Sequence, residues 1–165
     1  MKEKNKTEKL VEVYVDLPNH WAIDGETMWG LPLGNDIYVL KSIPCYSYDL
    51  NRGDCVVASP EPDGSIRNIR KVHGRSGNRT LRVLFAEKVP AKDMAKFIAS
   101  FKGYGAESVQ VNERFFSVDI PPTGDYDSLY LLLEEWETKG DIQYETCEAR
   151  EEGSFDDLPA RGETG

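Results

Sequence analysis

Apolar and polar residues alternate over residues 10–17, LVEVYVDL, where the valines at 11, 13 and 15 share one face. This period of two is typical of a strand with one buried side. Two more pairs of strand-like runs follow, with Gly, Asn, Asp or Pro between the members of each pair. These runs cover residues 28–33, 37–43, 54–59 and 65–72. Because short strands and turns recur here without a helical period, we predict a small antiparallel β-barrel-like lobe over residues 10–75.

The pattern changes after the glycine-containing loop at residues 73–78. Residues 91–102 bring Met94, Phe97 and Phe101 to one side at helical spacing. A second helix is predicted after Asp125, a capping residue, with a stripe of leucines that ends at Trp136. Strand-like runs surround these helices, at residues 81–86, 107–111, 114–120 and 142–149. The order strand, helix, hairpin, helix, strand is that of a ferredoxin-like βαββαβ unit.

The predicted fold class is therefore α+β, with the barrel-like lobe followed by a ferredoxin-like lobe over residues 79–149. Residues 1–9 and 150–165 are rich in charged and small polar side chains and offer little to bury. We expect both segments to be disordered tails.

Three stretches of the sequence resemble a bacterial domain family of unknown function. They are MWGLPLGNDIYVLKSIPCYSYDLNRGDCVVASPEPDG, HGRSGNRTLRVLFAE and VDIPPTGDYDSLYLLLEEWE. The similarity covers about residues 10–147. It implies a bacterial cytoplasmic protein, and it supplies no activity or catalytic residues.

Charge is unevenly distributed along the 165 residues, although the formal net charge is -9. Residues 1–64 carry 6 Lys and Arg against 11 Asp and Glu, residues 65–86 carry 6 against none, and residues 87–165 carry 8 against 18. This balance argues against non-specific binding of nucleic acid or anionic lipid over the whole surface. No apolar run approaches the length of about 18 residues that a membrane span needs.

Candidate catalytic groups are few. His20 and His73 are the only imidazoles, and the sequence contains neither a GxSxG elbow nor an HExxH motif. Cys45, Cys55 and Cys147 are odd in number and form no CxxC pair, which favours structural roles and a cytoplasmic location. We predict no metal site, no cofactor and no enzymatic activity. An active site assembled in a groove between the lobes from residues distant in sequence stays open as a third possibility.

The leading functional hypothesis is a cytoplasmic binding protein that masks or modulates a macromolecular partner. The proposed contact is an acidic surface on the second predicted helix, formed by Glu134, Glu135 and Glu137. Acidic surfaces of this kind suit the inhibition of basic nucleases, because complementary charge accelerates encounter. An immunity-type or ribonuclease-regulating role is the specific form of this hypothesis, by analogy of fold and charge.

The alternative is an RNA- or nucleotide-binding module built on the basic segment. Its residues are Arg67, Arg70, Lys71, Arg75 and Arg79. Strict alternation would place Arg67 and Lys71 on one face of a strand and Arg70 on the other, which splits the charge. Phe115 and Phe116 are adjacent and should also face opposite ways, one in the core and one as a candidate platform for stacking bases. Pairing of the arginines with the acidic lobe is the structural interpretation of the same segment.

Overall fold

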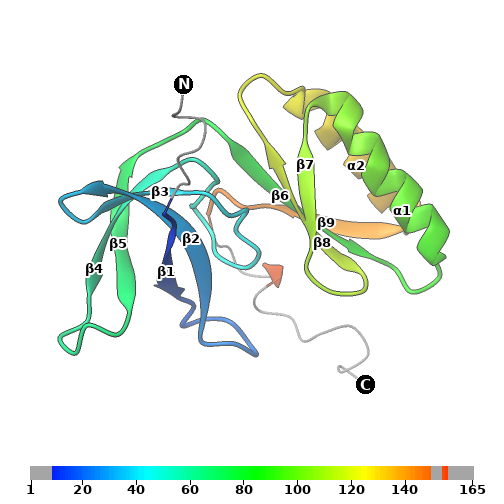
Figure 1. The fold of residues 1–165 in the computed structure, drawn as a ribbon. Helices are drawn as coiled ribbons and strands as arrows, with labels where there is room; N and C mark the ends of the chain where they lie inside the picture. The colour runs from blue at the N-terminus through cyan, green and yellow to red at the C-terminus, as the bar shows by residue number, and fades with distance from the viewer. Residues whose placement is uncertain (1–8, 150–153, 156–165) are drawn as a thin grey trace.

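The computed structural model describes residues 9–149 and 154–155. Within them the chain forms nine strands, two α-helices and one short 3-10 helix (Figure 1). The first five strands are β1 (Val11–Asp16), β2 (Gly25–Gly34), β3 (Ile37–Leu40), β4 (Cys55–Pro60) and β5 (Arg67–Gly74). The other elements are β6 (Arg79–Phe85), α1 (Ala91–Ala99), η2 (Ser100–Tyr104), β7 (Glu107–Gln110), β8 (Phe115–Ile120), α2 (Tyr126–Thr138) and β9 (Ile142–Thr146).

The first five strands close into a barrel in the order β1-β2-β3-β4-β5. Each strand pairs antiparallel with the next, and a parallel contact between Tyr14 of β1 and Asn68 of β5 closes the circle. Val13, Met28 and Leu40 fill the interior and are almost inaccessible to solvent. The expected α+β class with a barrel-like lobe is thus confirmed, and the parallel closure adds a pairing that alternation alone does not predict.

Strand β5 departs from strict alternation. Its register against β4 shifts between the pairs Val57–Lys71 and Ala58–Ile69, which leaves Arg70 as an extra residue in a bulge. As a result Arg70 and Lys71 are both exposed, although they are neighbours in sequence. The prediction that they lie on opposite faces is therefore wrong, because the bulge resets the pleat.

The second sheet has the order β7-β8-β6-β9 with antiparallel pairs throughout. Helices α1 and α2 cover one of its faces (Figure 1). Leu81, Phe116 and Leu133 belong to the core between sheet and helices. Asp125 caps α2 as predicted, since its Oδ1 accepts a hydrogen bond of 3.1 Å from the N–H of Ser128. Helix α1 ends at Ala99 and continues as the 3-10 turn η2, which stops at Gly105 with a positive φ of 79°.

The other face of the second sheet packs against the long segment 41–54, which connects β3 to β4. The Ser117 hydroxyl of β8 donates a hydrogen bond of 2.5 Å to the carbonyl of Pro44. All six residues of β8 are consequently buried, three on each side. The barrel lobe therefore covers the sheet face that the helices leave open.

Phe115 and Phe116 do point to opposite faces of β8. Phe116 belongs to the helix-side core, whereas Phe115 lies beside the rings of Tyr46 and Phe155. Phe115 is only 9% exposed, so it is not an open platform for stacking bases. The predicted disordered tails, residues 1–9 and 150–165, lie outside the described residues except at residues 9, 154 and 155.

Candidate functional site

Arg82 is the buried cation among the described residues, with 1% of its surface exposed. Strand β6 carries it on the face that meets the barrel lobe, opposite Leu81 and Val83. Its Nη2 donates to the carbonyl of Ser47, and its Nη1 lies 3.6 Å from a carboxylate oxygen of Glu145 on β9. Burial opposes the charged form, but the surrounding negative groups raise the pKa of Arg82 overall, so it remains a cation.

A second buried charge, Glu26 of β2, holds the segment that Arg82 contacts. Its two carboxylate oxygens accept backbone hydrogen bonds from Cys45, Tyr46 and Ser47, at 2.5, 3.1 and 3.0 Å. Three N–H donors converging on one carboxylate satisfy its need for hydrogen bonds without water. Glu26 of the barrel and Arg82 of the second sheet therefore both form hydrogen bonds with the backbone of residues 45–47.

Glu145 completes this cluster. The hydroxyl of Tyr48 donates to its Oε2 at 2.6 Å, and the Arg82 guanidinium lies 5.0 Å from the centre of the Tyr48 ring. Burial and this hydrogen bond to a carboxylate both raise the pKa of Tyr48. Two atoms in the cluster, Arg82 Nε and Ser47 Oγ, are buried without a hydrogen-bond partner among the described residues. The cluster is closed and its charged groups point at each other, which is typical of a structural core of polar residues.

The thiols nearest to this cluster are protonated at neutral pH. Burial first, and then the Glu26 carboxylate, raises the pKa of Cys45 to about 11. Burial likewise raises the pKa of Cys147 to about 12. A thiol becomes a strong nucleophile when its pKa is lowered, so both residues are weak nucleophiles here.

A further polar cluster joins the lobes at the loop between β5 and β6. The buried carboxylate of Asp54 accepts hydrogen bonds from the backbone N–H and the hydroxyl of Ser76, at 2.8 and 3.1 Å. Asn78 donates to the buried Asp119 at 3.0 Å, and Arg52 reaches the same carboxylate at 3.0 Å. Burial raises the pKa of Asp119, although Asn78 and Arg52 act in the opposite direction. These contacts tie the connection between the lobes to both of them.

The predicted acidic surface is exposed. Glu134, Glu135 and Glu137 all lie on α2 with their side chains in solvent. No Lys or Arg in the described part of the chain forms an ion pair with any of the three. The three carboxylates lie within about one turn near the C-terminal end of α2 and concentrate negative charge there.

The predicted basic segment is not brought together as one patch. Arg75 lies 3.0 Å from Asp49 and 3.7 Å from Asp54, and Arg70 lies 3.6 Å from Glu61. Arg79 pairs with Glu148 at 2.8 Å and stacks over the ring of Tyr126 at 3.5 Å. Of the five cations, Arg67 and Lys71 are exposed and form no ion pair with a carboxylate of the described residues. The arginines therefore serve mainly as internal partners of the acidic side chains.

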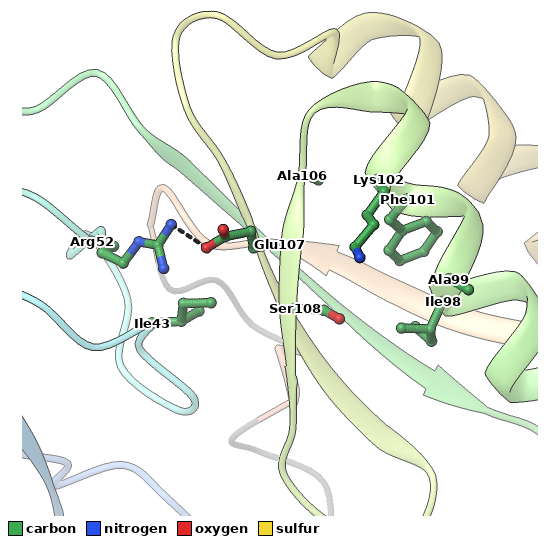
Figure 2. A pocket seen from close by; sticks show the side chains of 9 residues that line it. All are labelled: Ile43, Arg52, Ile98, Ala99, Phe101, Lys102, Ala106, Glu107 and Ser108. Carbon is green, nitrogen blue, oxygen red and sulfur yellow. Dashed lines mark hydrogen bonds and ion pairs between the residues drawn. The ribbon is translucent and has the colours of Figure 1, made fainter.

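An open groove of about 420 Å³ lies where segment 41–54 meets the outer edge of the second sheet (Figure 2). Ile43 and Arg52 border it from one side, and Ile98, Phe101 and Lys102 from the other. The carboxylate among its lining residues is that of Glu107, which accepts a hydrogen bond of 2.5 Å from Arg52. The groove thus presents backbone groups, apolar side chains and the cations Arg52 and Lys102 to a ligand, whereas its carboxylate, Glu107, is already paired with Arg52.

Sequence reasoning missed Glu26, Arg82 and Glu145 as partners in one cluster. A signal existed for Arg82, because it is the single charge inside the otherwise apolar run LRVLF, at a position whose neighbours are buried. A weaker signal marks Glu26, because regular alternation of β2 places it on the same face as the buried Met28. The pairing depends on the packing of two lobes, which a local pattern does not contain.

Residues 9–149 and 154–155 show neither a metal-ligand cluster nor a membrane-spanning helix. No group of three or more His, Cys, Asp or Glu side chains in that part of the chain is arranged to hold a metal ion. None of its helices has the length and apolar character needed to cross a membrane.

Comparison with known proteins assigns the chain to a family. A model of the domain of unknown function DUF4265 matches residues 26–144, which is more than half of the chain. The chain belongs to the DUF4265 family. This confirms the resemblance seen in the sequence, and the DUF4265 match begins within the barrel and ends in the last strand of the second sheet.

A solved structure shares the fold of this DUF4265 protein. It is described as a novel crystal structure of a hypothetical protein from Neisseria gonorrhoeae, with a TM-score of 0.70 and 20% sequence identity. The alignment covers 86% of the present chain and 96% of the other. Among curated proteins, none matches the chain.

Proposed function

We propose that this DUF4265 protein is a non-enzymatic, cytoplasmic binding protein that masks or modulates a basic macromolecular partner. The observation that carries the proposal is the contrast between the two charged regions. The carboxylates of Glu134, Glu135 and Glu137 are exposed and without described ion-pair partners, whereas Arg70, Arg75 and Arg79 are paired with acids. The charge that this part of α2 offers to a partner is therefore negative.

The architecture supports a rigid presentation of this surface. The strand order β7-β8-β6-β9, with two helices on one face, supports a ferredoxin-like assignment for the second lobe. The polar contacts through Arg82 and Asp119 hold that lobe against the barrel. A surface that is ordered before binding loses less conformational entropy when its partner docks.

The specific form of the proposal is an immunity-type or ribonuclease-regulating inhibitor. Nucleases that bind RNA carry basic surfaces, and an acidic protein competes for these surfaces through the same long-range attraction. The high pKa of the Cys45 and Cys147 thiols agrees with a role that does not depend on a nucleophile.

The test is affinity capture from bacterial lysate at low salt, comparing the native chain with a variant that carries E134K, E135K and E137K. A control variant with E12K, E87K and E113K changes net charge equally, at exposed acids elsewhere on the surface. We expect a stoichiometric basic protein with the native chain and the control, and its loss with the α2 variant. Equal capture by all three proteins would refute the acidic contact.

RNA or nucleotide binding through the basic segment is the alternative, and the pairing of its arginines weighs against it. It predicts that nucleic acid co-purifies with the native chain and that R67A with K71A removes it. The binding would also weaken steeply with salt, because phosphate contacts release counterions.

A further inference from the structure

Strand β7 forms an open edge of the second sheet. It pairs with β8 on one side, and no strand of the described residues pairs with its other side. The hydrogen bond from the N–H of Val111 to the carbonyl of Phe115 identifies residues 111 and 115 as a hydrogen-bonded pair of the antiparallel ladder. Because such pairs alternate along a ladder, Val109 and Glu107 also bond to β8. Ser108 and Gln110 therefore direct their backbone N–H and C=O groups outward.

A hydrogen bond just before β7 agrees with the outward direction of these backbone groups. Ala106, two positions before Ser108, also faces outward, and its N–H donates to the carbonyl of Phe101 in η2 at 3.2 Å. The backbone groups of Ser108 and Gln110 have no backbone partner among the described residues. An edge strand with unpaired groups is a template for another extended chain.

The groove of Figure 2 lies at this edge, and Glu107 and Ser108 of β7 belong to its lining (Figure 2). One wall consists of Ile98 and Phe101 on the helical side of the sheet, and the other of Ile43 and Arg52 on the barrel side. Successive side chains of an extended peptide point to opposite sides, so both walls would be used. A peptide paired with β7 would place alternate side chains against each wall.

Charge selects the kind of peptide. Lys102 extends from η2 into the groove beside β7 and is exposed, and no described carboxylate pairs with it (Figure 2). Arg52 on the other wall already contacts both Glu107 and Asp119. The unneutralised charge in the groove is thus the ammonium of Lys102, which favours a carboxylate on the helical side of the incoming strand.

We propose that the edge of β7 binds an extended segment of a partner protein, adding a strand to the sheet, with an Asp or Glu of that segment paired to Lys102. An apolar side chain next to the carboxylate packs against the partly exposed Ile98. This site is separate from the acidic residues of α2 and does not depend on them.

The probes are capped seven-residue peptides of alternating Thr and Val, with Asp or Lys at the central position. Binding to the isotope-labelled full chain is followed by amide NMR shifts, and dissociation constants come from the titration. We expect the Asp peptide to shift the amides of Ser108 and Gln110. The dissociation constant of the Lys peptide should be higher by a factor of up to about five. N-methylation of the peptide amides that face β7 should weaken binding about tenfold, because each lost hydrogen bond removes a backbone contact.

Two variants locate the site. K102E should reverse the preference between the Asp and Lys peptides, while K96E, at an exposed lysine of α1 outside the groove, should leave it unchanged. The N–H of Ser108 points outward and makes no ladder bond to β8. S108P removes this donor and should therefore weaken the binding of both peptides.

The proposal is overturned if neither peptide shifts the amides of β7, or if N-methylated and unmodified peptides bind equally. It is also overturned if the native chain forms a dimer that S108P converts to a monomer, since the edge would then belong to a second copy. E134K with E135K and E137K should leave peptide binding intact, which separates this test from that of the acidic surface.

Discussion

Replacement of Arg82 by methionine tests whether the buried cluster holds the two lobes together. Methionine retains much of the length and the apolar stem of arginine but lacks the guanidinium. The variant leaves Glu145 with its hydrogen bond from Tyr48 and no buried cation, and it deprives the Ser47 carbonyl of its donor. Arg82 is 1% exposed and Glu145 only 11% in their side chains, so water does not replace the lost contacts.

The magnitude follows from these contacts. Removing one partner of a buried ion pair costs about 3–5 kcal/mol, because the other charge stays in a poorly solvated site. This range already includes the charge-assisted hydrogen bond to Ser47, which by itself contributes about 1.5–3 kcal/mol. The Nε of Arg82 is buried without a described hydrogen-bond partner, and this reduces the free energy by which the native cluster stabilises the fold. We therefore expect R82M to reduce the free energy of unfolding by about 3–4 kcal/mol.

Urea denaturation followed by tryptophan fluorescence and by circular dichroism measures this change. The control is R79M, three residues away on the same strand, where the ion pair with Glu148 is half exposed. An exposed pair contributes about 1 kcal/mol or less. If R82M unfolds within about 1 kcal/mol of the native chain, or no more easily than R79M, the cluster is not what joins the lobes.

Three other outcomes are expected. E26Q should lower the free energy of unfolding by about 2–3 kcal/mol and increase amide exchange at residues 45–47, because the carboxylate that accepts three N–H groups is lost; unchanged exchange would contradict this. Burial raises the pKa of Asp119 above 3.8, so its contribution to stability is present below that pH and is lost as pH rises through the folded-state pKa. The stability difference between the native chain and D119N, measured by urea titration from pH 3.5 to 7, should therefore decrease with pH, and a constant difference would disprove the assignment. Alkylation of the partly exposed Cys45, followed by mass spectrometry, should still accelerate between pH 8 and 10, since its pKa is about 11; a plateau near pH 8 would show a lowered pKa instead.

The sequence was sufficient to predict the elements that depend on local periodicity. Strand β1, the hairpins and the Asp125 cap of α2 lie within a few residues of their expected positions. Their hydrophobic period and turn residues act over short distances, which is why they can be read from the chain alone. Glycine at 105 likewise ends the helical stretch with a positive φ, although α1 itself ends earlier at Ala99.

Features that depend on contacts between distant segments could not be predicted in this way. The bulge at Arg70 arises from the register of β4 against β5, and it reverses the expected alternation of charges. Burial of Arg82 depends on the turn at residues 45–47, which Glu26 positions from another strand. The groove at β7 forms only because segment 41–54 folds back beside that edge.

The acidic surface of α2 is the central claim, and its most direct test is the salt dependence of binding. The dissociation constant of the captured basic protein should be measured at about 50 and 200 mM salt for the native chain, for E134K/E135K/E137K and for E12K/E87K/E113K. We predict that binding of the native chain and the control weakens by about tenfold or more over this range, and that the α2 variant binds at least about tenfold more weakly at low salt. Equal affinity of all three proteins, or affinity that does not change with salt, would contradict the account.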